Sequence, residues 1–355
     1  MAYSDIKDPS AHFQIKTGVG ASSPQSHTFD GNSDLQPDLL WWKRRDASGG
    51  HTLHDSTRGR TKFLYASADT NEQTDGNLIS SFDTNGWSTG SSWFDLGSQT
   101  WVVWAWKANG GTTSSNTDGS ITSTVQANQD AGFSIVTYTG TGSAATVGHS
   151  LGEKPAMIIV KRRDSTGNWY VAHKGLDNMS SWRFLLHVNF SAGSSTAEFG
   201  VEPTSSVFSV NTSSATNASS GTHVAYCFAE KQGYSKMGTV TGNGNANGPF
   251  VYTGFKPAFL FYRNYTVNGD GAGWIYDGTR SEFNVITAGR IRTDSSSAEV
   301  TENATSGLIV DFLSNGFKIR GNTDRAWNYS GDKYIFTAFA ENPFVTSTGV
   351  PTTAR

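Results

Sequence analysis

The chain of 355 residues is poor in cysteine, in charge and in long apolar segments. Its one cysteine, Cys227, excludes an internal disulfide and stands in an apolar run that predicts a buried thiol. No run of about 18 apolar residues is present, so we expect no membrane insertion. The opening, Met1 to Pro9, has neither the basic nor the apolar region of a secretory signal, and we expect none.

Charged residues make up only 16% of the chain, and the net charge is −3. No basic stripe is present, which argues against a nucleic-acid partner. The sequence has no phosphate-binding loop, dinucleotide fingerprint or zinc-protease motif, and no carboxylate pair of the glycosidase kind stands out. We therefore expect no cofactor and no enzymatic activity.

The residues that are abundant predict β-structure. Aromatic residues make up 12% of the chain and glycine contributes 39 residues. Short runs of alternating apolar residues lie between polar, glycine-rich turns, whereas no long stretch has the spacing of an amphipathic helix. This pattern predicts an all-β protein built from antiparallel β-sandwiches.

Two strand-like blocks recur three times in the same order. A proline opens the first block and a basic residue follows six positions later, in the pairs Pro37 with Lys43, Pro155 with Lys161, and Pro257 with Arg263. The second block recurs as residues 100–106, 222–228 and 333–339. Chance is a poor explanation for a double echo, so we infer an internal repeat of roughly 100–120 residues.

The repeat predicts three tandem β-sandwich modules. The predicted boundaries are 1–108 for module one, 109–131 for a Gly/Ser/Thr-rich linker, 132–232 for module two, 233–345 for module three and 346–355 for a polar tail. Large apolar residues stand on both faces of the second block. We therefore expect this block to be buried against a neighbouring module or against another chain.

One segment has the pattern of a serine-hydrolase nucleophile. Gly148-His-Ser-Leu-Gly152 matches the G-x-S-x-G elbow, which requires a strand-to-helix turn in an α/β sheet. Here Ser150 lies between two predicted strands, and neither sister module has a serine or histidine at the matched place. A glycine-rich turn is the favoured interpretation.

A second candidate is a metal site at His51 and His54. Three positions separate the two residues, which places them on opposite faces of a strand, and no third histidine or cysteine stands at ligand spacing. The matched places in the sister modules hold Trp169 and Trp274. We interpret position 51 as an aromatic core position filled by histidine.

Two oxygen-rich loops, 69–76 and 268–271, contain calcium-type ligands without the EF-hand spacing, so we expect solvated loops. The runs 43–46 and 161–164 both read Lys-Arg-Arg-Asp and suit either an anion or sugar-acid contact or a strand end with paired charges. We favour the strand end, because module three has only Arg263-Asn264 at this place.

Exposed tryptophans are the remaining candidates for a binding role. Most tryptophans stand in alternating apolar runs and are predicted to be core residues. Trp93, Trp182 and Trp327 have polar neighbours in the sequence, so we predict that they lie at the surface and contact a glycan or a partner.

Several segments together resemble a family of marine bacteriophage virion proteins. They are residues 116–125, 132–142, 155–164, 224–230, 248–257, 312–318 and 348–355. Members of this family are tail-fibre-like or general structural proteins with suspected lectin-like, jelly-roll-like sandwiches. No catalytic residues come with the resemblance.

The resemblance implies a non-enzymatic virion protein, assembled in the host cytoplasm, whose partners are other tail or capsid proteins. A tail fibre or tail-tip protein that adheres to a host-surface glycan is the first expectation, with module one as the anchor. A capsid decoration or head-fibre protein is the alternative, and a glycan-degrading tail enzyme comes third. Analogy with phage fibres adds the expectation of a homotrimer.

Overall fold

The computed structural model describes residue 4 and residues 6–21, 24–90, 97–269, 271–280, 288–301, 310–321 and 325–343. Their regular secondary structure is almost wholly antiparallel strand, which confirms the all-β prediction. Helix in these ranges is limited to the 3-10 turn η1 (Pro9–Ala11) and the single-turn α1 (Ser214–Asn217). None of the helices in this part of the chain is long and apolar enough to cross a membrane.

We keep the names module one, two and three for strands β1–β9, β10–β19 and β20–β28. Module one contains β1 (Phe13–Val19), β2 (Ser26–Thr28), β3 (Leu39–Arg44), β4 (Thr52–Asp55), β5 (Lys62–Tyr65), β6 (Gln73–Thr74), β7 (Ile79–Asp83), β8 (Gly86–Thr89) and β9 (Thr100–Trp106). Module two contains β10 (Ser114–Asn116), β11 (Ser123–Asn128), β12 (Phe133–Thr139), β13 (Ala145–Gly148), β14 (Met157–Arg162), β15 (Tyr170–His173), β16 (Trp182–Leu185), β17 (Gly193–Ser194), β18 (Val207–Val210) and β19 (Thr222–Phe228). Module three contains β20 (Ser235–Thr241), β21 (Phe250–Tyr252), β22 (Phe255–Asn264), β23 (Gly273–Asp277), β24 (Ala288–Arg292), β25 (Val300–Thr301), β26 (Val310–Leu313), β27 (Gly316–Ile319) and β28 (Lys333–Pro343).

One strand order recurs in the three large sheets. The sheets read β1-β9-β3-β4-β5-β6, then β12-β19-β14-β15-β16-β17, then β20-β28-β22-β23-β24-β25. Their register recurs as well, in the pairs Arg44 with Trp101, Arg162 with His223, and Asn264 with Tyr334. The blocks matched in the sequence therefore occupy the same place in each sheet.

Residues 109–131 are not the free linker that their composition predicts. They form β10 and β11, which extend the large sheet of module two to eight strands. Ile121 and Val125 are buried in the core of this module, and Ser123, between them, is buried too. The spacing of two was the signal of a strand, but the surrounding Gly, Ser and Thr residues obscured it. The predicted tail, 346–355, lies outside the described residues.

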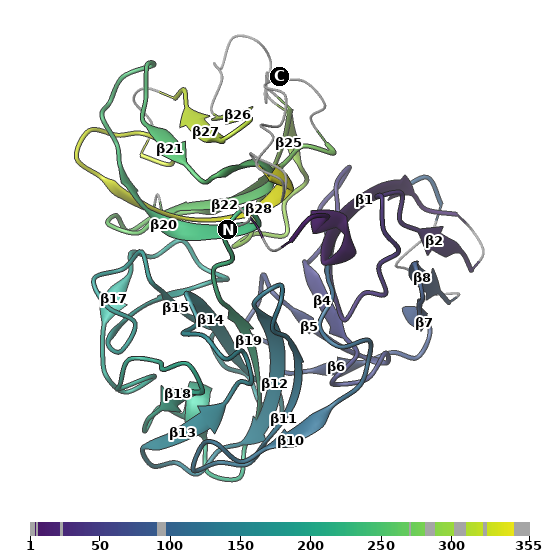
Figure 1. Ribbon diagram of the computed structural model, residues 1–355, viewed down its shortest axis with the longest axis vertical. Coiled ribbons are helices and arrows are strands. Elements are labelled where there is room, and N and C mark those ends of the chain that lie inside the picture. The colour runs from purple at the N-terminus through teal and green to yellow at the C-terminus, as the bar shows by residue number, and fades with distance from the viewer. Residues whose placement is uncertain are drawn as a thin grey trace.

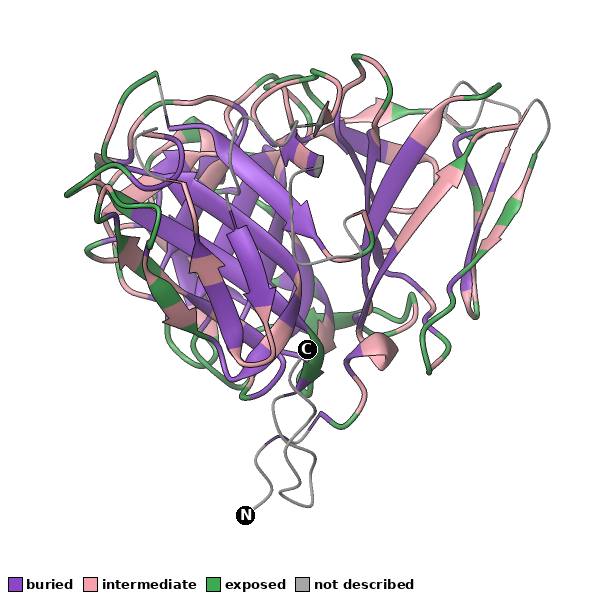
Figure 2. Cartoon of the chain, turned by 90° about the horizontal axis from the view of Figure 1, so that it is seen from above, coloured by how far each residue is buried: buried purple, intermediate pink, exposed green. Residues whose placement is uncertain are grey.

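Each module is a sandwich because a small sheet covers one face of its large sheet. The small sheets are β2-β8-β7, β13-β18 and β21-β27-β26, and they lie at the periphery of the molecule (Figure 1). In module one, the buried rings of Trp42, Trp87 and Trp101 fill the space between the two sheets. Burial follows this layering, with buried strands inside and exposed loops outside (Figure 2).

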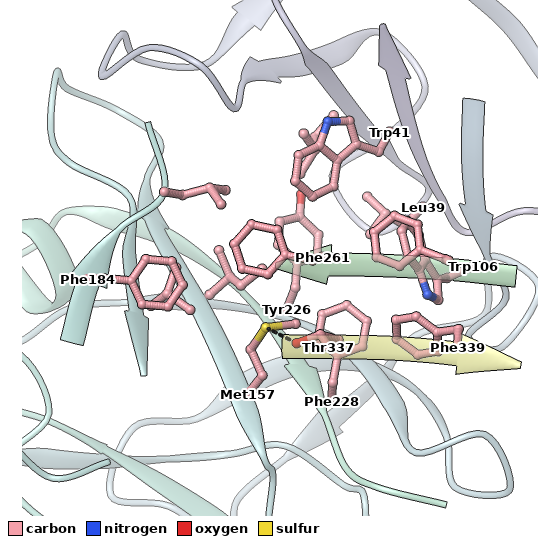
Figure 3. Close-up of a pocket in the computed structure, with 15 residues that line it drawn as sticks. Leu39, Trp41, Trp106, Met157, Phe184, Tyr226, Phe228, Phe261, Thr337 and Phe339 are labelled. Atoms are coloured by element: carbon pink, nitrogen blue, oxygen red, sulfur yellow. Dashed lines mark hydrogen bonds between the residues drawn. The ribbon is translucent and has the colours of Figure 1, made fainter. Parts of the chain in front are cut away.

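The opposite faces of the three large sheets meet at the centre of the molecule. Phe339 of module three lies 5.3 Å from Phe13 and 5.6 Å from Trp106 of module one, between ring centroids. It lies 5.9 Å from Phe228 of module two. The rings around it leave only a cavity of about 30 Å³, lined almost entirely by apolar side chains (Figure 3).

This central core explains why the second block is apolar on both faces. One face packs against the small sheet of its own module, and the other packs against the other two modules. Of the two expected kinds of neighbour, the structure therefore supplies the neighbouring module. The apolar faces for which we also considered burial against another chain are thus buried within one chain.

The basic residue that ends each first block contacts the next module. Lys43 Nζ donates to Ser296 O of module three at 3.3 Å, and Lys161 Nζ donates to Asp69 O of module one at 3.2 Å. Arg263 Nη2 donates to Val188 O of module two at 2.7 Å. These three contacts link module one to three, three to two, and two to one, so the modules form a closed ring.

An acidic residue strengthens two of the three interfaces. Glu72 of module one accepts hydrogen bonds from Arg58 of its own module at 2.9 Å and from Arg163 of module two at 2.9 Å. Asp55, paired with Arg58, also accepts a hydrogen bond from Tyr226 OH at 2.7 Å. The interface between modules one and three repeats this network with Glu299, Arg280, Arg45, Asp277 and Trp104.

At the interface between modules two and three, the described residues do not form this network. Tyr265 and Ala192 make the backbone hydrogen bond that Arg163 and Glu72 make at the first interface, and neither carries a charge. In place of the aspartate contact, His173 Nε2 lies 3.2 Å from Thr337 Oγ1. The ring is thus regular in its backbone and different in its side-chain chemistry.

We predict that Phe339→Ala lowers the free energy of unfolding by about 3–5 kcal/mol, because it removes a ring shared by all three modules. A single cooperative transition should remain, at lower denaturant, in urea unfolding followed by circular dichroism. Phe190→Ala is the control, since this side chain is 57% exposed and its loss should change stability by no more than about 0.5 kcal/mol. Equal effects of the two changes would contradict a shared core.

We predict that Glu72→Gln destabilises the protein by about 3–5 kcal/mol, because Arg58 and Arg163 lose their common carboxylate. Burial alone would raise the pKa of Glu72, but the hydrogen bond from Arg163 and the charge of Arg58 outweigh it and lower the pKa. The stabilisation is therefore complete above the ordinary pKa of glutamate and is lost as the pH falls through the lowered value.

Thermal unfolding at pH 7 and in acid tests both statements. The difference between wild type and Glu72→Gln should shrink as the pH falls. Glu202→Gln, at an exposed pair with Lys154, should cost no more than about 1 kcal/mol. A pH-independent difference would exclude the ionised bridge.

Candidate binding surface

Trp327 is not at the surface, which corrects the sequence-based expectation. Its side chain is 5% exposed, and its ring lies 4.9 Å from that of Trp274 and 4.3 Å from the Arg290 guanidinium. The polar neighbour Asn328 is buried as well, and its Nδ2 donates to Asn245 O at 2.8 Å. The polar residues around Trp327 therefore form a hydrogen-bonded turn, although their composition is that of an exposed loop.

Trp182 does not share a surface with Trp327, because Trp327 is buried. Trp182 begins β16 and is half-buried, packed against the central core. Trp93 belongs to residues 91–96, which lie outside the described residues. The predicted tryptophan contacts are therefore not gathered into one site in the described part of the chain.

Ser150 lies in a turn after β13 and has no histidine as a base among its described contacts. Its Oγ accepts a hydrogen bond from Asn116 Nδ2 at 2.8 Å, and its backbone φ is +57°. His149 is turned to the backbone: Nδ1 accepts from Leu151 N at 3.2 Å and Nε2 donates to Thr204 O at 3.3 Å. Burial lowers the pKa of His149 to about 4, so it stays neutral at physiological pH.

We predict that Ser150→Ala costs about 1 kcal/mol of stability, through the lost Asn116 hydrogen bond, and leaves any host-binding or glycan-related activity unchanged. Thermal unfolding and a cell-adhesion assay of the purified variant check the two parts. Loss of a measured hydrolytic activity in this variant would refute the turn interpretation.

His51 fills a core position at the interface between modules one and three. Its Nδ1 accepts from Trp41 Nε1 at 2.9 Å, and its Nε2 donates to Arg292 O at 2.7 Å. Burial lowers its pKa to about 3. In the strand register, Thr52 corresponds to Trp274 of module three. His51 therefore corresponds to Gly273, one position before the Trp274 that we expected. Within the described ranges, no group of three or more His, Cys, Asp or Glu residues could hold a metal ion.

The charged runs 43–46 and 161–164 lie at strand ends and have paired charges, in agreement with the interpretation that we favoured. Arg44 pairs with Asp46 at 2.7 Å, and Arg162 pairs with Asp164 at 2.8 Å. The oxygen-rich loop 69–76 contributes Glu72 to the contact with module two. These charges therefore hold strand ends and interfaces.

The most exposed aromatic pair on a described strand lies on β21, at the edge of the small sheet of module three. Phe250 is 46% exposed and Tyr252 is 52% exposed, while Val251 between them packs against the core. Both rings therefore project from the same outer face of this sheet. Gly316 stands opposite Tyr252, where any Cβ would lie 2.0 Å from Val251 O and 3.2 Å from Phe250 Cε2.

The sister modules show that the fold does not require these rings. In module one the register matches Phe250 and Tyr252 with Ser26 and Thr28. In module two the matched residues are Thr146 and Gly148. Exposed aromatic residues at this place are therefore a property of module three alone.

Polar groups lie beside the two rings. Lys318, opposite Phe250 on β27, donates from Nζ to Asn247 Oδ1 at 2.5 Å. Asp311, opposite Lys318 on β26, pairs with Arg320 at 2.5 Å. The outer face of this small sheet thus combines two aromatic rings with hydrogen-bonding and charged groups, a combination that suits binding.

Residues 8–343 match the family described as a domain of unknown function, DUF7483. The chain belongs to this family. Because the match runs from the residue before η1 to the last residue of β28, the DUF7483 unit includes all three modules of the ring. No curated protein matches the chain.

Sequence reasoning missed the aromatic pair of this DUF7483 chain. The alternation of residues 250–252 predicts a strand, but it does not show which of these residues face outward. The available signal was the contrast between repeats, since Phe250 and Tyr252 align with small or polar residues in both sister modules. Finding it required the register, because these outer strands are only three or four residues long.

Proposed function

We propose that this DUF7483 protein is a non-enzymatic structural protein of a bacteriophage virion, a tail fibre or tail-tip protein that adheres to a host-surface glycan. The resemblance of its repeated segments to virion proteins supports the location. The exposed pair Phe250 and Tyr252 carries the adhesive role, because the fold keeps two aromatic rings in solvent where its sister modules have none.

The chemistry of the pair suits a sugar. Aromatic faces pack against the apolar face of a pyranose ring, and rigid aromatic side chains lose little conformational entropy on binding. The strand holds the Cα atoms of Phe250 and Tyr252 about 7 Å apart. Both rings can therefore contact one sugar unit or two adjacent units. Nearby polar groups can bind the hydroxyls.

The placement of the modules suits an anchor and a tip. The small sheets of modules one and three point in different directions, so module one is free to attach to the virion while the aromatic pair faces the host (Figure 1). The shared core holds the two in a fixed relation. We therefore keep module one as the proposed anchor.

A capsid decoration or head-fibre role is the second candidate. It is favoured by the ring that closes within one chain, since such a body needs no trimer to be complete. The number of copies per virion separates the two: a few tens indicate a tail, and hundreds indicate a capsid. A glycan-degrading enzyme has the least support, because Asp55 is buried and both Asp55 and Glu72 are ion-paired.

The direct test replaces the pair with the residues of module one, as Phe250→Ser with Tyr252→Thr. We expect unchanged thermal stability and at least about 30-fold weaker adhesion of the purified protein to host cells, since central aromatic contacts contribute about 2 kcal/mol or more. Phe190→Ser is the matched control, a 57% exposed ring outside this sheet. Undiminished adhesion by the double variant would refute the role of this surface.

A further inference from the structure

The charge beside the aromatic pair is also restricted to module three. Lys318 stands opposite Phe250, and the register places Ser88 and Ser209 at the matched positions of modules one and two. Two aromatic rings and one cation thus replace small or polar residues at three neighbouring positions of one sheet face. Because these three side chains lie on the solvent side of the sheet, their difference from the sister modules does not improve the packing of the core.

Among the described residues, no carboxylate balances the charge of Lys318. Its described partner is the neutral amide of Asn247, and no described carboxylate forms an ion pair with it. The nearest acid across the sheet, Asp311, is paired with Arg320. Among the described residues of this face, Lys318 and Arg320 stand against the buried Asp311, which leaves one positive charge beside the rings.

We propose that the ligand of this surface is an acidic glycan, in which a sugar ring stacks on Phe250 and Tyr252 and its carboxylate binds Lys318. This inference rests on the proposed adhesive function. An ammonium group has three donors, and Asn247 occupies one of them, so two remain for the carboxylate. The hydrogen bond to an ionised partner also adds selectivity over neutral sugars.

The partner chemistry follows from the position of the cation. Lys318 Nζ reaches toward Asn247, which precedes β21 by three residues and so lies on the side of the aromatic strand. A ring seated on the aromatic pair therefore presents an equatorial carboxylate to the ammonium group without crossing the sheet. A neutral hexose can use the rings but leaves Lys318 solvated.

The test compares a tetrasaccharide of glucuronic acid with the matching tetrasaccharide of glucose by titration calorimetry. We expect the wild-type protein to prefer the acidic sugar by about tenfold at low salt, with the preference shrinking as salt is added. Lys318→Gln should abolish the preference and keep the affinity for the neutral sugar. Lys62→Gln, at another partly exposed lysine whose Nζ donates to a neutral oxygen, is the charge-matched control.

The remaining outcomes separate this inference from the proposed function. Equal affinity for the two sugars, or a preference that survives Lys318→Gln, overturns the acidic ligand and leaves glycan adhesion standing. Binding of a sulfated tetrasaccharide in preference to the uronic one overturns the carboxylate assignment. If neither sugar binds while the Phe250→Ser, Tyr252→Thr variant still loses adhesion, the acidic ligand is wrong and adhesion stands. If that variant also adheres normally, both are wrong.

Discussion

The burial of a second face on each large sheet is the constraint on which the rest of the structure depends. A sandwich normally covers one face of a sheet and leaves the other to solvent, but here that other face carries Trp104, Tyr226 and Phe339. Because each such face needs partners, the three modules complete one another. The aromatic centre makes the ring one folding unit, which agrees with a family match that spans all three modules.

The interfaces share a backbone geometry and differ in side chains, and this difference sets which module packs against which. Two interfaces need a carboxylate facing an arginine, whereas the third places His173 against Thr337. Wrong pairing of modules would leave the half-buried Arg163 or Arg45 without its acid, and removing one partner from a partly desolvated ion pair is destabilising. The polar contacts thus supply specificity to a centre whose apolar faces would otherwise be interchangeable.

The regular part of this architecture could be predicted from the sequence. The recurrence of two matched strands in each module followed from the proline and basic-residue pattern, because a buried antiparallel sheet imposes both a period of two and a fixed register. The sequence predicted local exceptions poorly: residues 109–131 have the composition of a linker yet pair as strands, and Trp327 lies beneath a turn of polar residues. A polar composition indicates solvent exposure on average. Polar groups can nevertheless be buried when they are hydrogen-bonded, as Asn328 is. The aromatic pair required the register between repeats, which only the structure supplies.

Repetition also explains where a binding surface can arise. The central faces are coupled to one another, so a change there affects all three modules at once. The outer faces of the small sheets have no such coupling, and the three copies differ freely at the positions of Phe250, Tyr252 and Lys318. A fold that keeps its stability at the centre leaves its periphery open to new chemistry. Module three differs from both sister modules at three adjacent positions. A single ligand that contacts all three side chains is the simplest physical reason for the three positions to differ together.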